Sequence, residues 1–286
     1  MNDVPVSPVS IGWEGRRERM TTMVELDALM TALPALLGQV QREQTMTREQ
    51  LTAELGTLGL HQPVYDDGLP EDDEVNEHLW VRAPLTGVGD TAAAERQLRT
   101  AISRKAGKTI GSDKHWDLGP FKVTARIRRD GELELWFVGT YSLRVLRDAA
   151  KDYLDGADPM TWLLAHELID EGAEENERGF FPKPKWVSQN PTARLLPDGG
   201  VSASLTFPAA RRPPGATAKN DDDAYAATLA YLEEALGERD DPSPNRTPAW
   251  TRGARKFTFY RMRSSTRSAR FGQVGIEEPE ESEGGA

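Results

Sequence analysis

The segment 121–138 restricts the fold more than any other part of this chain. Apolar and polar residues largely alternate over 121–127 and again over 132–138, on either side of an Arg-Asp-Gly turn sequence. A two-residue turn would mix apolar and charged side chains on one face. A three-residue turn instead pairs Ile127 with Leu133 and sets Arg128 opposite Glu132. The pattern predicts an antiparallel hairpin with one buried face and with Gly131 in the left-handed region.

A second hairpin is predicted around residue 200. The Pro-Asp-Gly sequence at 197–199 favours a tight turn, which sets Leu195 opposite Val201 and Ala193 opposite Ala203. A predicted helix follows each hairpin, so the order hairpin-then-helix occurs twice. The two copies share no convincing residue identity, and an internal duplication is therefore only a hypothesis.

Helix boundaries follow from residues that cap helices. Thr22 with Glu25, and Thr47 with Gln50, have the spacing of a capping box. Pro34 predicts a kink in the first of these helices or the start of a new one. Further helix starts are predicted at Asp90 or Thr91, at Ser142, at Asp158 and at Asp221–Asp223.

These elements predict an α+β fold, because enough short strands alternate with helices to argue against an all-helical bundle. We expect a helical region at residues 1–60 with a disordered N-terminal tail, and an α+β domain at 78–237 with two hairpins packed by helices. Residues 238–286 are expected to form a Pro-rich linker, a basic aromatic arm and an acidic disordered tail.

The charge changes abruptly near the C-terminus. The chain of 286 residues has a formal net charge of −11, yet residues 242–276 contain eight Arg and Lys and no acidic residue. Five glutamates follow within residues 277–283. A local departure of charge of this kind usually reports on a binding partner. The glutamates are expected to shield the arginines until a partner displaces them.

The basic segment 250–271 is therefore the predicted binding site. Its cations suit phosphates or acidic protein surfaces, and its aromatic rings suit stacking on bases. The predicted binding residues are Arg252, Arg255, Lys256, Phe257, Phe259, Tyr260, Arg261, Arg263, Arg267 and Arg270. The leading interpretation is a non-catalytic binding or assembly protein whose anionic partner is a protein or a nucleic acid. The same alternation also fits a purely structural strand with Phe257 and Phe259 buried.

Composition narrows the other possibilities. The chain has no cysteine, which excludes disulfides, iron–sulfur clusters and cysteine nucleophiles. No run of about 18 apolar residues is present, so no membrane span or membrane partner is expected, and the polar first residues do not resemble a signal peptide. We expect a cytoplasmic protein of bacterial or phage origin that requires no cofactor.

An enzyme remains an alternative interpretation. Asp113, His115 and Asp117 share one side of an extended segment, and His166 lies one helical turn before Asp170. Such groups suit a metal-dependent hydrolase. The second histidine of a zinc-protease helix is replaced by Asp170, and no later histidine is available as a third ligand.

A DNA-binding regulator is the second alternative. The helix predicted at 91–105 carries Arg96 and Arg99, and the hairpin that follows it carries Arg126 and Arg128. This order resembles that of winged helix-turn-helix proteins. The expected tight turn before the recognition helix is missing, because some 35 residues separate it from the preceding helix.

Overall fold

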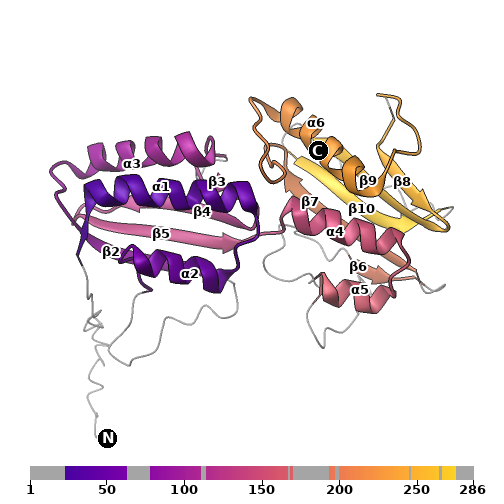
Figure 1. Ribbon diagram of the computed structural model, residues 1–286, viewed down its shortest axis with the longest axis horizontal. Coiled ribbons are helices and arrows are strands. Elements are labelled where there is room, and N and C mark those ends of the chain that lie inside the picture. Colours follow the sequence, from indigo (N-terminus) through magenta and orange to yellow (C-terminus); the bar gives the residue numbers. More distant parts are fainter. Residues whose placement is uncertain are drawn as a thin grey trace, which may run out of the picture.

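The computed structural model describes residues 23–62, 78–110, 114–166, 168–169, 193–196, 200–244, 246–263 and 266–274. Helices and two five-stranded sheets are combined in this part of the chain, so the expected mixed α+β class is confirmed. Each sheet has its own hydrophobic core. The first core ends at Phe137 and the second begins at Tyr141. The described chain therefore forms two halves that lie side by side (Figure 1).

The first half contains a sheet with the strand order β1-β2-β5-β4-β3. Strand β1 pairs with β2 in parallel, and the remaining neighbours are antiparallel. The elements, in chain order, are β1 (Val24–Glu25), α1 (Leu26–Glu43), α2 (Arg48–Thr57), β2 (His78–Thr86), α3 (Thr91–Ala106), β3 (Trp116–Asp117), β4 (Phe121–Ile127) and β5 (Glu132–Gly139).

The helix starts of the first half follow the predictions in part. Thr47 and Gln50 form the predicted capping box of α2, and Asp90 caps α3. Helix α1 begins at Leu26, and Glu25 takes its N-cap position without a side-chain bond, so the helix starts later than the predicted box at Thr22. Thr22 itself lies outside the described residues. Helix α1 also continues through Pro34 to Glu43 as a single element.

The predicted hairpin is confirmed in every pair. Ile127 faces Leu133, the neighbouring apolar pairs follow the same register, and Arg126 faces Glu134. Gly131 has φ +83°, and its amide donates to the carbonyl of Arg128 at 3.0 Å. Only glycine adopts this conformation at low cost, so Gly131 fixes the loop length and hence the buried face.

The second half contains a sheet with the order β6-β7-β10-β9-β8, and its neighbouring strands are antiparallel. Ser142 and Asp158 cap α4 and α5 as predicted, whereas Asn220 caps α6. The elements are α4 (Leu143–Leu154), α5 (Pro159–Ala165), β6 (Ala193–Leu195), β7 (Val201–Pro208), α6 (Asp221–Leu236), β8 (Ala249–Arg252), β9 (Arg255–Arg263) and β10 (Thr266–Gln273).

The second predicted hairpin is confirmed in its pairing. Leu195 faces Val201 and Ala193 faces Ala203, whereas Gly199 lies outside the described residues. Strands β6 and β7 occupy one edge of the sheet, and β7 continues it by pairing with β10.

The two halves repeat one order of elements. Apart from the edge strands β1 and β6, two helices precede a strand, a helix and three further strands in each half, and the last of those strands inserts beside the first in the sheet. The edge strands differ, because β1 precedes the two helices and pairs in parallel, whereas β6 follows them and pairs antiparallel. Strands β2, β5, β4 and β3 thereby correspond to β7, β10, β9 and β8. This repeat differs from the sequence hypothesis, because the hairpin β4–β5 corresponds to β9–β10 and not to β6–β7.

The C-terminal segment is part of the second sheet. We expected a basic arm outside the fold, but residues 249–273 form three strands, and β10 is the central strand of the sheet. Alternation explains the difference, because Phe257 and Phe259 are fully buried on one face of β9. The acidic tail lies outside the described residues. The buried cores divide the chain near residue 140, whereas the sequence placed boundaries near 60–78 and 237. The domain division itself stays a prediction.

All helices of the described chain pack on one face of each sheet. Their buried residues belong to the same cores as the inward-facing strand residues, such as Leu135 in the first half and Phe257 in the second. Figure 1 shows the helices of both halves on the viewer's side of the strands. The opposite face of each sheet is called its open face below.

Candidate binding surfaces

The predicted binding residues divide between the two faces of the second sheet. Phe257 and Phe259 point into the core, where Phe257 lies 5.0 Å from Phe271 between ring centroids. Lys256 and Tyr260 alternate with them and therefore belong to the open face. Arg263 ends β9, and its side chain lies outside the description.

Two of the predicted arginines bind the ends of helices. Arg255 donates to the carbonyl oxygens of Tyr153 and Ala157, both at 2.7 Å, at the end of α4. Arg252 donates to the carbonyl oxygen of Leu236 at 3.0 Å, at the end of α6, and pairs with Asp155. The last carbonyls of a helix have no intrahelical donor and carry partial negative charge, so arginine is a fitting partner. These contacts give both arginines a structural role.

Two further arginines also have partners within the chain. Arg261 pairs with Asp222 at 2.6 Å, although both side chains are largely exposed. Arg267 is 1% exposed and donates to the carbonyl oxygen of Asp221 at 2.8 Å and to the Thr228 hydroxyl at 3.3 Å. Burial, and to a smaller extent the nearby Arg261, lower the pKa of Arg267 to about 10. Arg267 is thus a core residue.

The open face of the second sheet is basic and rich in hydroxyl groups. Ser204 and Ser268 pair across β7 and β10 with their oxygens 3.3 Å apart, and Arg270 lies over the Tyr260 ring at 5.3 Å. Lys256 is exposed, and Arg194 of β6 lies on the same face opposite Ser202. None of the five strands contains an acidic residue.

The open face of the first sheet combines charge pairs with tryptophans. Trp80 of β2 faces Trp136 of β5, with ring centroids 5.8 Å apart. In the next row Glu134 lies between Arg82 and Arg126, and Glu134 pairs with Arg82 at 3.1 Å. Glutamates thus neutralise part of the positive charge on this face.

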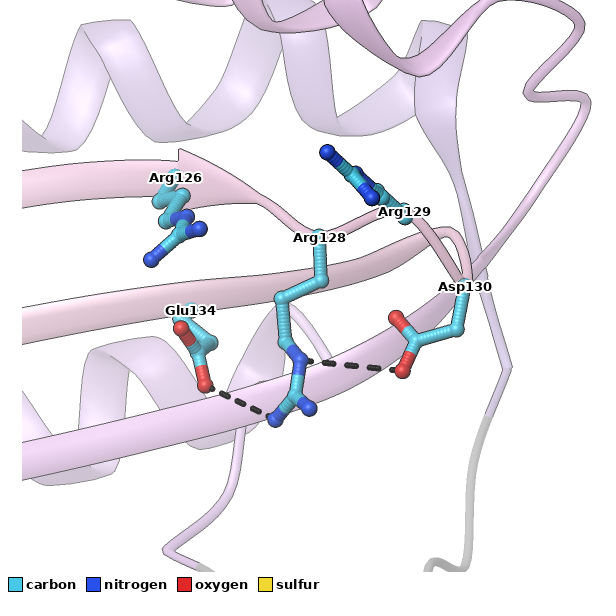
Figure 2. A pocket seen from close by; sticks show the side chains of 5 residues that line it. All are labelled: Arg126, Arg128, Arg129, Asp130 and Glu134. Atoms are coloured by element: carbon cyan, nitrogen blue, oxygen red, sulfur yellow. Dashed lines mark hydrogen bonds and ion pairs between the residues drawn. The ribbon is translucent and has the colours of Figure 1, made fainter.

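The β4–β5 turn forms a shallow hollow at the end of this face. Figure 2 shows Arg128 between Asp130 and Glu134, to which its nitrogens are 3.6 and 3.2 Å distant. Neighbouring carboxylates raise the pKa of Arg128, with Glu134 as the largest cause. Arg126 and Arg129 also line the hollow and are exposed. Arg128 is therefore held in place by its carboxylate partners more firmly than Arg126 and Arg129 are.

A buried arginine that the sequence analysis missed joins the two halves. Arg211 is 1% exposed, and its Nε donates to Asp117 Oδ2 of β3 at 2.8 Å. It also donates to the Thr140 hydroxyl at 3.2 Å and to the carbonyl oxygen of Tyr141. The Pro-rich composition of residues 208–220 indicated only a loop. A buried arginine on such a loop leaves no periodic signal in the sequence.

The histidines of the metal alternative lie apart. Asp117 already binds Arg211, and His166 Nε2 lies 2.9 Å from Asp152 Oδ2 of α4. His115 is buried beside β3, while Asp113 and Asp170 lie outside the described residues. Within the part of the chain that the structure describes, no group of three or more His, Cys, Asp or Glu is placed to hold a metal ion.

The helix of the DNA-binding alternative packs inside the first half. Arg99 of α3 donates to the carbonyl oxygens of Ala125 at 3.1 Å and Lys114 at 2.9 Å, and it lies over the Trp116 ring. Strand β2 separates α2 from α3, so these helices do not form a helix-turn-helix pair. Arg96 and Arg104 remain exposed on the outer side of α3.

Across the described ranges, no helix is both long enough and apolar enough to cross a bilayer. Comparisons with protein-family models, with curated proteins and with solved structures find no match to this chain. The functional argument therefore depends on the geometry and charge of the two sheet faces.

Proposed function

We propose that the protein is a non-catalytic binding or assembly protein that engages an anionic partner through the open face of its second sheet. The observation that carries the proposal is the charge of that sheet. Its five strands contain no Asp or Glu, and Arg194, Lys256 and Arg270 lie on the face that no described helix covers. Strands that carry basic but no acidic side chains attract ligands of negative charge.

This proposal retains a part of the site predicted from the sequence. Lys256, Tyr260 and Arg270 belong to the open face, and hydroxyl groups of β7 and β10 surround them. Arg252, Arg255 and Arg267 bind other parts of the fold and are assigned structural roles. A bacterial or phage origin and a cytoplasmic location stay predictions from composition.

Charge reversal tests the proposal. We expect the protein to bind poly-L-glutamate with an affinity that decreases as salt increases, because exposed charges are screened. Lys256→Glu combined with Arg194→Glu should weaken binding by roughly tenfold or more at low salt. The matched control is Arg246→Glu, which makes the same charge change per site at a side chain that is 76% exposed and lies outside the sheet.

The outcomes separate the three interpretations. Equal loss of binding in the face variant and in the Arg246 control would contradict a defined site on the open face. Stoichiometric metal in the purified protein would instead favour the hydrolase that uses His115 or His166. Duplex DNA binding that is lost on neutralising Arg96 and Arg104, but kept in the face variant, would favour the regulator.

A further inference from the structure

We infer that one extended acidic polypeptide segment crosses the open faces of both sheets, and that contacts between the two halves hold these faces in line. The inference rests on the proposed function, since the open face of the second sheet is one of its two contacts. It adds the class of partner, a second contact on the first sheet and a role for the buried arginine at the junction.

The first step is the rigid junction of the halves. The guanidinium of Arg211 binds Asp117 of the first half, and both side chains are at most 4% exposed. The same guanidinium binds Thr140 and the carbonyl of Tyr141 on the short link between β5 and α4. A buried ion pair with additional hydrogen bonds has one favourable geometry, so it opposes rotation about the link.

Neighbouring residues of the same loop bind the ends of two helices in the first half. Arg212 donates to the carbonyl oxygen of Ala106 at the end of α3, at 3.0 Å. The side-chain amide of Gln44 donates to the carbonyl oxygen of Arg212 at 2.8 Å, and the Gly215 amide donates to that of Arg42 at 2.8 Å. These contacts attach the loop at points separate from the ion pair and therefore restrict tilt as well as rotation.

The second step is the common direction of the open faces. In Figure 1 both sets of helices lie on the viewer's side of their sheets, and β5 points toward the second half. Both open faces therefore point away from the viewer. From the middle of β5, half of its 8 residues and the three-residue link carry the chain roughly 23 Å to the start of the second half, so the centres of the two faces lie farther apart than this. About seven residues of extended polypeptide cover this minimum distance.

The third step is the chemistry of the partner. Each face offers exposed cations, namely Arg126 and Arg129 in the first half and Lys256 in the second. The outward rings are partly covered, because the Arg82 guanidinium lies 3.6 Å from the Trp80 ring centroid and Arg270 lies over Tyr260. Bases need open rings for stacking, whereas carboxylates bind arginine directly. An acidic polypeptide fits these faces better than a nucleic acid.

Peptide length tests the two-face contact. A peptide of about five glutamates reaches only one face, while one of about twenty reaches both. We expect the longer peptide to bind at least tenfold more tightly, since the second contact is intramolecular. In the variant Arg126→Glu/Arg129→Glu the longer peptide should bind only roughly threefold more tightly than the shorter one. This remaining difference is expected because a longer peptide can bind one face in more registers.

These measurements distinguish failure of the inference from failure of the proposed function. If neither peptide binds, or if Lys256→Glu has no effect, the proposed function fails. If the short peptide binds in a Lys256-dependent manner but the longer one gains nothing, only the two-face inference fails. Single-stranded oligo-thymidine of matched charge that binds more tightly than the longer peptide would overturn the partner class.

The junction has its own test, and the absence of cysteine allows clean spin labelling. Glu54→Cys and Glu238→Cys place labels at exposed positions on the two halves. Pulsed electron paramagnetic resonance should give one narrow distance distribution. Asp117→Asn, which removes the charge but keeps the shape, should broaden it and weaken the longer peptide at least threefold while the shorter peptide is unaffected.

Arg212→Ala is the second junction variant in case Asp117→Asn does not fold. It removes the hydrogen bond to Ala106 but keeps the ion pair of Arg211 with Asp117, so it should broaden the distribution less. A broad distribution in the parent protein, or a narrow one in both junction variants, would overturn the role assigned to the junction.

Discussion

The two halves of this protein share the order and pairing of four of their five strands, but they distribute charge differently. The first sheet carries acidic and basic residues that pair on its open face, as Glu134 does with Arg82. The second sheet contains no acidic residue, and its arginines either bind helix ends and the core or face outward. The comparison shows that sheet topology and surface charge depend on different residues. The inward-facing apolar residues alone define the strands, and the outward-facing residues set the charge of the open face.

The cores also differ in composition. The inward face of the first sheet is mainly aliphatic, with Leu135 and Val123 as typical members. The second core gathers aromatic side chains, and Phe271 lies 4.7 Å from Trp162 and 5.5 Å from Tyr153 between centroids. Phe137 and Phe271 occupy corresponding positions on β5 and β10, which allows a matched comparison of the two halves.

The largest expected effect comes from this matched pair. Phe137→Ala and Phe271→Ala should each lower the free energy of unfolding by about 3–5 kcal/mol, because both rings are fully buried. Phe271→Ala should cost more, since its ring contacts three aromatic neighbours. Urea unfolding followed by circular dichroism measures both. Two separate transitions, each sensitive to one variant only, would show that the halves unfold independently despite their junction.

The sequence predicts the local parts of this fold well. The register of the β4–β5 hairpin follows from Gly131 and from alternation, and the caps at Thr47, Asp90 and Ser142 act within one helical turn. These features involve neighbours in the chain. They can therefore be predicted from a short stretch of sequence.

Long-range pairing is what the sequence analysis missed. Strand β10 pairs with β7, so that Phe271 faces Ala203 across a large separation in sequence. Alternation in β10 is interrupted by the buried Arg267 and by an irregularity beside it, which hides the strand. The basic segment consequently resembled an arm. Arg211 could not be found either, because its partners, Asp117 in the first half and Thr140 on the link, are distant from it in the sequence.

A smaller loss of stability is expected when a structural arginine is removed, and it distinguishes structural from outward-facing arginines. Arg255→Ala removes two hydrogen bonds to helix-end carbonyls and a contact with the Tyr153 ring, so it should lower the free energy of unfolding by about 2 kcal/mol. The exposed control Arg246→Ala should change it by less than about 0.5 kcal/mol. Binding of poly-L-glutamate by folded Arg255→Ala should equal that of the parent. A loss of binding without a loss of stability would return Arg255 to the recognition surface.

The stability of the protein at alkaline pH tests the burial of Tyr141, which lies next to the junction at the start of the second half. Burial raises the pKa of Tyr141 well above its usual value, and Asp148 adds to the effect. Since the folded pKa exceeds the unfolded value, the stabilisation is complete below about pH 10 and is lost as pH rises above it. Near pH 10.5 the loss is about 0.8 kcal/mol for one such tyrosine.

The variant Tyr141→Phe isolates this contribution. Its free energy of unfolding should decrease less between pH 8 and pH 10.5 than that of the parent, whatever its value at pH 8. Urea titrations at both pH values measure the difference. Equal pH dependence in the two proteins would mean that Tyr141 ionises in the folded state as readily as in the unfolded chain.

The smallest expected effect is on binding affinity, and it comes from the acidic segment that follows the second sheet in the sequence. Residues 277–283 contain five glutamates, and the open face of that sheet is basic. A nearby acidic segment competes with an acidic partner for the same cations, so removing residues 277–286 should tighten binding of poly-L-glutamate by roughly threefold at low salt. Replacing the five glutamates by glutamine is the matched control, because it keeps the length. If both changes tighten binding equally, charge is responsible. If neither changes the affinity, the acidic tail does not act on the open face.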